Sequence, residues 1–317
     1  ENGTLLPGSL IADTPVNING FAPQNYDLTY DGAVPASEAV SRSLNVPSVH
    51  ILRKYGIESF LSTLRECGMT TFTRSAEDYG LSLILGGGEC RLDEVVSAYA
   101  SMSRSYAQGK TDFPLSDKVA LWHTFNAMSE VNRPDEIDWH VIRSAGRTAW
   151  KTGTSYGYRD GWACGVTPAV AAGVWAGNAS GAAAPGLIGA RTAGPVLFDI
   201  LNLFPEKSWF SEPADNEGVL TPVCHQSGCI AGPYCEERDT LLIPRAGLRT
   251  ETCPYHYRID GNNIFRLPPA MEWYYRQKHP EYGRKDRTET MPSGISPMEF
   301  IYPEGGSSIT LPLQLDG

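Results

Sequence analysis

The sequence predicts an α+β fold in which an antiparallel sheet is flanked by helices. Two observations lead to this prediction: helical apolar patterns fill the first part of the chain, and three adjacent strand-like segments then precede a further helix. Helices and strands that are grouped separately along the chain are typical of α+β proteins. In parallel α/β proteins they alternate instead. With 317 residues the chain can bury a core, and its length suggests about two domains.

The beginning of the chain is expected to be irregular and then helical. A short strand is predicted near Ile11–Ile18, among residues that Gly and Pro interrupt. Ser37 is a suitable N-cap for a short helix, and Pro47 suits the first turn of the next one. A third helix is predicted over Ile57–Cys67, because a glycine follows it.

Two further helices follow in the pattern. Apolar residues at helical spacing predict one from Leu92 to Tyr106, with Gly109 ending the run. Ser116 is the expected cap of another helix, which runs to Val131.

The pattern then changes to short strands. Ala149–Thr154, Trp162–Val166 and Val170–Trp175 are separated by turn residues, and they predict an antiparallel meander. Small residues dominate the third strand, as expected where a helix packs closely. That helix is predicted over Thr192–Phe204.

The last third of the chain is rich in Pro, Cys and charged residues, and only Pro268–His279 has helical character. Strand-like runs return in Met298–Gly317, but they are too few to form a stable sheet. The predicted organisation is therefore a first domain over 1–204, a Cys- and Pro-rich connecting segment over 205–290, and the start of a truncated β domain over 291–317.

Charge excludes one class of partner. The chain has 36 acidic and 26 basic residues and a formal net charge of -10. A nucleic-acid partner is not expected, because binding phosphates requires a basic face.

No apolar stretch reaches the roughly 20 residues that a membrane-spanning helix needs.

The segment Lys151-Thr152-Gly153-Thr154-Ser155 lies on the first predicted strand, directly before a turn. In serine acyl-transferases of the penicillin-recognising type, a lysine in this setting provides positive charge for a substrate carboxylate and for proton movement. Glycine allows a peptide to lie against the strand, and the next N–H can face an oxyanion. The alternative is an exposed edge-strand lysine followed by a turn glycine.

A second pattern, Ser43-Leu44-Asn45, lies in a predicted loop between helices. A hydroxyl in this position can relay a proton between two lysines, and the amide can hold a substrate carbonyl. Taken in isolation, Ser-x-Asn is common and is more often a helix cap.

The two patterns and their surroundings resemble the transpeptidase domain of class A penicillin-binding proteins. The resemblance covers about residues 1–204 and lies in the following segments: Asn25–Asp27, Ser37–Val49, Leu83–Glu89, Leu92–Tyr99, Lys151–Ser155, Asp160–Trp162 and Gly173–Asn178. The later part is similar to the connecting segment and the first residues of the C-terminal β-sandwich domain in the 1C type of these proteins.

The resemblance implies a penicillin-recognising serine transpeptidase fold and a role for each residue of the two patterns. Ser43 would be the relay hydroxyl, Asn45 the ligand of the substrate amide and Lys151 the electrostatic lysine. Thr154 would donate its backbone N–H to the oxyanion and its hydroxyl to the substrate carboxylate. Thr152, Gly153 and Ser155 would complete the substrate-binding strand.

The implied activity is the cross-linking of peptidoglycan stem peptides by D,D-transpeptidation, with β-lactams as inhibitors and no cofactor. The resemblance places the parent protein at the periplasmic side of the bacterial inner membrane. It also implies a membrane anchor and a glycosyltransferase domain upstream of this chain.

One feature of the family is missing. The nucleophile of these enzymes lies in a Ser-x-x-Lys motif, and none of the seven lysines here has a serine three residues before it. We therefore expect a polypeptide that is incomplete at its N-terminal side and inactive by itself. The alternative is a non-catalytic module that binds cell-wall peptide or a partner protein.

Four of the seven cysteines crowd the connecting segment: Cys224, Cys229, Cys235 and Cys253. Together with His256 they could ligate zinc, but no metal site is assigned at this point. The periplasmic setting implied by the resemblance favours disulfides, and Cys235–Cys253 is the preferred pair. Free thiols are the third interpretation.

Overall fold

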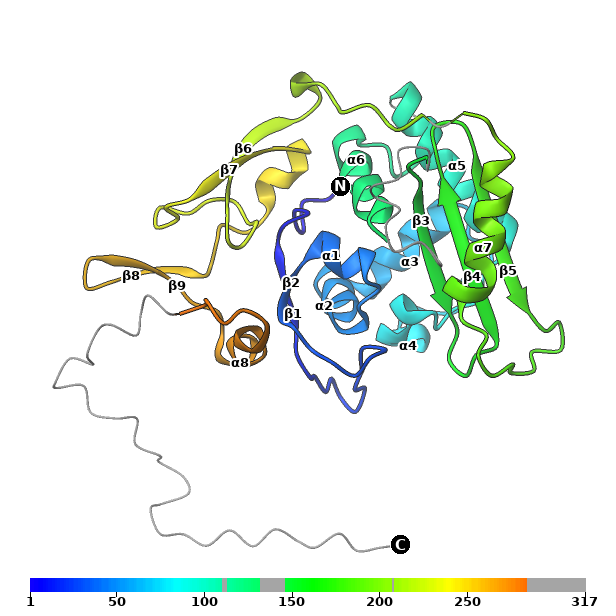
Figure 1. Ribbon diagram of the computed structural model, residues 1–317, viewed down its shortest axis with the longest axis horizontal. Coiled ribbons are helices and arrows are strands. Elements are labelled where there is room, and N and C mark those ends of the chain that lie inside the picture. The colour runs from blue at the N-terminus through cyan, green and yellow to red at the C-terminus, as the bar shows by residue number, and fades with distance from the viewer. Residues whose placement is uncertain (110–112, 132–145, 207, 284–317) are drawn as a thin grey trace, which may run out of the picture. The chain divides into compact units, whose positions relative to one another are not determined.

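The computed structural model of this chain describes residues 1–109, 113–131, 146–206 and 208–283 (Figure 1). Glu1–His279 form one compact unit. The strands expected in Met298–Gly317 lie outside the described residues. The division of the chain after residues 204 and 290 stays a prediction.

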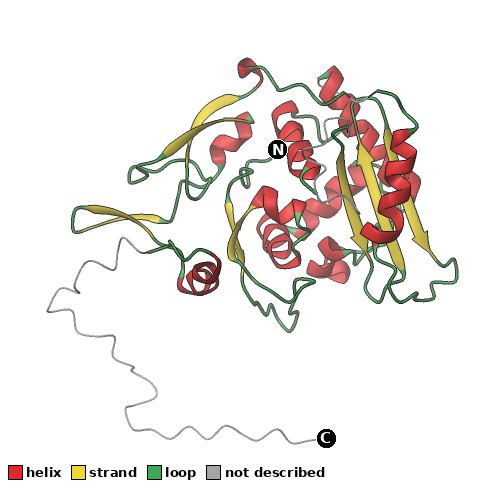
Figure 2. Cartoon of the chain, viewed as in Figure 1, coloured by secondary structure: helices red, strands yellow, loops and turns green. Residues whose placement is uncertain are grey.

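A three-stranded antiparallel sheet, in the order β3-β4-β5, is the predicted meander. Its strands are β3 (Ala149–Thr154), β4 (Asp160–Val166) and β5 (Ala171–Gly177). They lie within two residues of the predicted bounds, because short turns separate clear strand patterns. Helices pack against this sheet, so the α+β fold class is confirmed (Figure 2).

Helices cover both faces of the sheet (Figure 1). Gly161 in β4 faces α7 (Gly189–Asn202), because a Cβ at Gly161 would lie 2.7 Å from Thr192 Oγ1. Gly173 in β5 faces α5 (Leu92–Gln108), because its Cβ would lie 2.5 Å from Val96 Cγ2. Gly173 pairs with Cys164 of β4 and faces the same side of the sheet as Cys164. Cys164 and Gly161 are three positions apart on one strand, so they face opposite sides. The helices α5 and α7 therefore lie on opposite faces of the sheet.

The remaining helices of the first part pack beside the sheet. Their bounds are α1 (Ala36–Ser41), α2 (Asn45–Tyr55), α3 (Ile57–Glu66), α4 (Ala76–Tyr79), the 3-10 helix η1 (Gly80–Leu85) and α6 (Lys118–Ser129). Buried Leu52 of α2, Leu61 of α3 and Leu83 of η1 belong to one apolar cluster.

Three local predictions need correction. α1 begins at Ala36 with Pro35 in the N-cap position, so Ser37 lies inside its first turn. α6 is capped by Asp117 rather than Ser116, because the Asp117 carboxylate accepts a hydrogen bond of 2.9 Å from the N–H of Ala120. The first strand, β1, spans only Leu10–Asp13.

β1 pairs with β2 (Gly32–Pro35), and α8 (Pro269–Lys278) packs on β2. The contact depends on Gly32, which has a φ of +78° and whose Cβ would lie 2.2 Å from the carbonyl oxygen of Met271. α8 is the helix that the sequence predicts over Pro268–His279.

The connecting segment contains two hairpins that the sequence did not predict. β6 (Val219–Cys224) pairs with β7 (Arg238–Ile243), and β8 (His256–Ile259) pairs with β9 (Asn262–Phe265). Two 3-10 helices complete it, η2 (Asp215–Glu217) and η3 (Arg245–Arg249). None of the helices in the described residues is both long enough and apolar enough for a bilayer span.

Candidate active site

The two sequence patterns meet in space. The Lys151 ammonium group, on edge strand β3, donates a hydrogen bond to Ser43 Oγ in the loop between α1 and α2. The two residues are 108 positions apart in the sequence. The lysine of one pattern and the hydroxyl of the other therefore face a common point.

Ser43 has an unusual backbone conformation. Its φ is +56°, in the left-handed region, and it directly follows Arg42, the C-cap of α1. The N–H of Ser43 donates to the Val40 carbonyl at 3.1 Å, and that of Leu44 donates to Ala39 at 3.0 Å, which closes the helix end. Glycine is the residue that such a position favours, since a side chain there costs about 1–2 kcal/mol. Helix termination alone therefore gives no reason for serine.

Lys151 lies in a partly buried position, where desolvation lowers the pKa of its ammonium group to about 8. The ammonium group also donates to the Thr152 carbonyl at 3.2 Å. With a pKa this close to neutrality, a small change in its surroundings can move a proton to or from Lys151. Its hydrogen bond to Ser43 places a hydroxyl oxygen next to this ammonium group.

Asn45 is the first residue of α2, two positions after Ser43. One hydrogen of its side-chain amide is donated to the Gln24 carbonyl at 2.8 Å. The amide nitrogen has a second hydrogen, so it can still donate to another group.

The side chains of Thr154 and Ser155 form hydrogen bonds with neighbouring backbone groups. Thr154 Oγ1 accepts a hydrogen bond of 3.0 Å from the N–H of Gly189, at the beginning of α7, and its own hydroxyl hydrogen stays available to another acceptor. Ser155 closes the β3–β4 turn, since its Oγ accepts from the Asp160 N–H at 2.8 Å. A Cβ at Gly153 would make only an ordinary contact of 3.5 Å with Trp162, so packing does not require glycine there.

A hydrogen-bond network that was not recognised from the sequence anchors the beginning of α2, next to Ser43. Asn25 Nδ2 donates to Asp13 Oδ1 at 2.7 Å and to the Thr29 carbonyl at 2.9 Å, while Asn25 Oδ1 accepts from the Val46 N–H at 3.2 Å. Asp13 Oδ2 accepts from the Asp31 N–H at 2.9 Å. Asn25 thus ties α2 to the end of β1. The sequence singles out Asn25 only through the family resemblance.

Replacing Asn25 by alanine is expected to lower the free energy of unfolding by about 1–3 kcal/mol, because Asp13 Oδ1 and the Val46 N–H lose a buried partner. Urea unfolding measures the change. Asn17 is the matched control, since its side chain only accepts a hydrogen bond from the N–H of Gly20 in an exposed loop. Equal effects of the two substitutions would contradict the role of Asn25.

Comparison with curated proteins identifies the family. The chain is 33% identical over 239 residues to penicillin-binding protein 1C of Escherichia coli, an alignment that covers 72% of this chain and 31% of that protein. It is 26% identical to penicillin-binding protein 1F of Bacillus subtilis over 54% of this chain and 27% of the relative. The chain belongs to the class A penicillin-binding proteins. It spans between a quarter and a third of the length of these two relatives.

Solved penicillin-binding proteins share the fold. Penicillin-binding protein 1A of Haemophilus influenzae superposes with a TM-score of 0.56 at 16% identity, over 76% of this chain and 45% of that one. PonA1 of Mycobacterium tuberculosis, solved in complex with penicillin V, gives 0.52 at 20% identity, over 67% of this chain and 68% of that one. No protein-family model matches the sequence.

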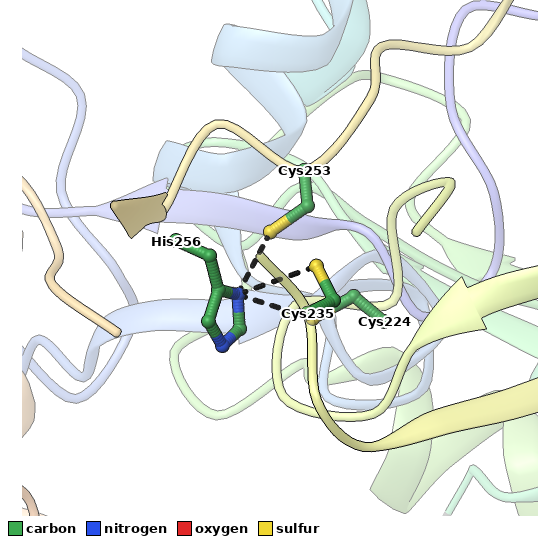
Figure 3. Close-up of side chains that lie close together, drawn as sticks. All are labelled: Cys224, Cys235, Cys253 and His256. Atoms are coloured by element: carbon green, nitrogen blue, oxygen red, sulfur yellow. Dashed lines mark hydrogen bonds between the residues drawn. The ribbon is translucent and has the colours of Figure 1, made fainter. Parts of the chain in front are cut away.

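The predicted Cys235–Cys253 disulfide is not present in the structure. All seven cysteines lie in described residues and all are unbridged. The sulfur atoms of Cys235 and Cys253 lie instead around Nδ1 of His256, together with that of Cys224 (Figure 3). Cys229 is buried nearby but lies outside this group.

Proposed function

We propose that this chain provides the substrate-binding side of a peptidoglycan D,D-transpeptidase site. The observation that carries the proposal is the hydrogen bond from Lys151 to Ser43, which brings two distant patterns to one point. Both patterns lie in segments that resemble the transpeptidase domain of the family.

The proposed chemistry is acyl transfer. A serine oxygen attacks the carbonyl carbon between the two D-alanines of a stem peptide, the terminal D-alanine leaves with a proton on its amine, and the acyl group then passes to an amine of a neighbouring stem. Ser43 relays protons between Lys151 and the base of the nucleophile. Lys151 and the Thr154 hydroxyl bind the terminal carboxylate, and Asn45 binds the peptide amide. β-Lactams acylate the same serine.

The strand β3 suits an extended peptide. Among the described strands it lies at one edge of the sheet, with β4 as its only neighbour. An extended ligand can add to such an edge through backbone hydrogen bonds. The N–H of Thr154 is proposed to stabilise the oxyanion.

The nucleophile is not among the 317 residues, since no lysine follows a serine by three positions. We propose that this chain alone does not form an acyl-enzyme. The membrane anchor, the glycosyltransferase domain and the periplasmic location belong to the same proposal and concern the whole protein.

Labelling with a fluorescent penicillin tests the function. The chain itself is expected to stay unlabelled, whereas a product of the same gene that begins upstream of Glu1 and includes a Ser-x-x-Lys motif is expected to be labelled covalently. Preincubation with unlabelled penicillin should abolish the signal. If the longer product also stays dark, the chain is a non-catalytic module that binds cell-wall peptide.

A further inference from the structure

Four potential metal ligands converge in the connecting segment, from places that are well separated along the chain. Cys224 ends β6, Cys235 precedes β7, Cys253 follows η3, and His256 begins β8. Their sulfur and nitrogen ligand atoms all lie within 4.8 Å of one another (Figure 3). The three cysteines are buried, with 1%, 2% and 9% of their surface exposed.

The spacing of these atoms fits a tetrahedral metal ion. Nδ1 of His256 lies 3.6 Å from Sγ of Cys224, 3.5 Å from that of Cys235 and 3.3 Å from that of Cys253. Around zinc, bonds of about 2.3 Å to sulfur and about 2.0 Å to nitrogen at tetrahedral angles place sulfur and nitrogen about 3.6 Å apart. The three distances from His256 to the sulfur atoms therefore match a tetrahedral zinc site to within about 0.3 Å.

Neighbouring groups orient the ligands as a metal requires. The other ring nitrogen of His256, Nε2, donates to Gln226 Oε1 at 3.0 Å, which leaves the Nδ1 lone pair free to bind a metal. Cys253 Sγ accepts from the Ser227 hydroxyl at 3.1 Å, and Cys235 Sγ accepts from the Gly232 N–H at 3.3 Å. Such donors stabilise thiolate sulfur, the form that binds zinc.

We propose that Cys224, Cys235, Cys253 and His256 bind one zinc ion in a closed structural site. On binding, three thiols release their protons to solvent and His256 binds as the neutral imidazole, so the site has a net charge of -1. The step needs no oxidant. All four positions around zinc are occupied by protein ligands, as in structural rather than catalytic zinc sites.

The segment around these four residues has small sheets and a small apolar core, so a metal cross-link would contribute to its stability. In the part of the segment that the structure describes, its two sheets have two strands each, and isolated two-stranded sheets are marginally stable. Within the described residues, the apolar cluster of β6 and β7 contains three buried residues, Leu6, Val223 and Ile243. Small units with little core commonly depend on a metal or a disulfide. A zinc ion would join β6, the loop before β7 and β8 at one point.

Metal analysis of the whole chain tests the proposal. The protein is produced without a histidine tag in zinc-supplemented medium, purified without chelators, and measured by elemental analysis; about one zinc ion per chain is expected. The single substitutions Cys224→Ser, Cys235→Ser and Cys253→Ser should each remove most of the zinc. Cys229→Ser is the matched control and should keep it, because Cys229 is equally buried but not among the four ligands.

A second measurement does not depend on variants that fold. Reconstituting the zinc-free wild-type chain with Co²⁺ should give the visible absorption of tetrahedral cobalt and a thiolate-to-cobalt band, and added zinc should remove both. The proposal is overturned if the wild-type chain holds no zinc and gives no such spectrum. It is also overturned if non-reducing peptide mapping finds a disulfide between two of the three cysteines, or if Cys229→Ser loses zinc as the ligand variants do.

Discussion

Replacing Lys151 by methionine is expected to slow acylation by penicillin about 10²- to 10³-fold in the product that carries the nucleophile, without lowering the stability of the fold. The loss is of the size seen when one group that stabilises developing charge is removed. Methionine has a similar length and no charge, so it occupies the partly buried position of Lys151 while removing the ammonium group that contacts Ser43. Stopped-flow or gel-based acylation rates measure the effect.

The pKa of Lys151 predicts how the stability difference between Lys151→Met and the wild type changes with pH. Burial lowers the pKa of Lys151 to about 8 from an unfolded value of 10.5, so the unfolded chain binds more protons than the folded chain between these two values. The free energy of unfolding therefore gains a contribution that increases as the pH rises through this window. At pH 7 the charged lysine opposes folding, and Lys151→Met should equal or exceed the wild type in melting temperature. By pH 10 that advantage should be smaller.

Ser43→Gly is the companion variant. Glycine adopts a φ of +56° without strain, so this substitution is expected to maintain or raise the melting temperature, while removal of the hydroxyl slows acylation. Lys54→Met is the control for loss of a lysine, since Lys54 forms only an exposed ion pair with Glu251 at 3.6 Å. If Lys151→Met and Ser43→Gly both destabilise the chain by several degrees, their contact has a structural role and the proposed site is wrong.

Periodicity was sufficient to predict the elements that build the scaffold. α5 and the strands β3 to β5 follow clear patterns, and their bounds lie within two residues of the prediction. The caps were less predictable. Ser116 and Asp117 are both good capping residues, and only the geometry of the helix start decides between them.

The hairpins β6–β7 and β8–β9 were missed because their signal is weak. The four strands have four to six residues each, and Pro222 interrupts the pattern of β6. β6 tolerates this proline because it lies at the edge of a two-stranded sheet. The family resemblance indicated that this segment connects two parts of the chain, but it did not indicate that the segment has its own core.

Contacts between distant residues formed the least predictable part of the site. Nothing in local sequence brings Lys151 to Ser43, or Asn25 to Asp13; in the first case the family resemblance supplied the expectation, and in the second there was none. The cysteines were assigned by compartment rather than by geometry. The expected oxidising compartment favoured a disulfide between two cysteines. The structure instead brings together three cysteine sulfur atoms and one imidazole, and a single disulfide would involve only two of these four groups.

Removing the proposed zinc ion should open the connecting segment locally and leave the sheet intact. After treatment with a chelator, backbone amides in β6 to β9 are expected to exchange at least tenfold faster, which corresponds to about 1.4 kcal/mol of local opening free energy. Amides of β3 to β5 should be unaffected, because their cores with α5, α6 and α7 share no residue with the cysteine group. Hydrogen exchange with mass spectrometry measures both regions in one experiment.

The same experiment predicts where the opening spreads. The N–H of Leu10 donates to the Ser227 carbonyl at 3.0 Å, and Leu6 shares the apolar cluster under β6 and β7, so residues 6–10 should also lose protection. β1 continues from there to Asp13, whose carboxylate holds Asn25 and through it the beginning of α2 beside Ser43. In the longer product that carries the nucleophile, a modest loss of acylation on chelation, restored by zinc, would show that the two sites are coupled along β1. Unchanged exchange in β6 to β9 after complete zinc removal would show that the metal does not hold this segment together.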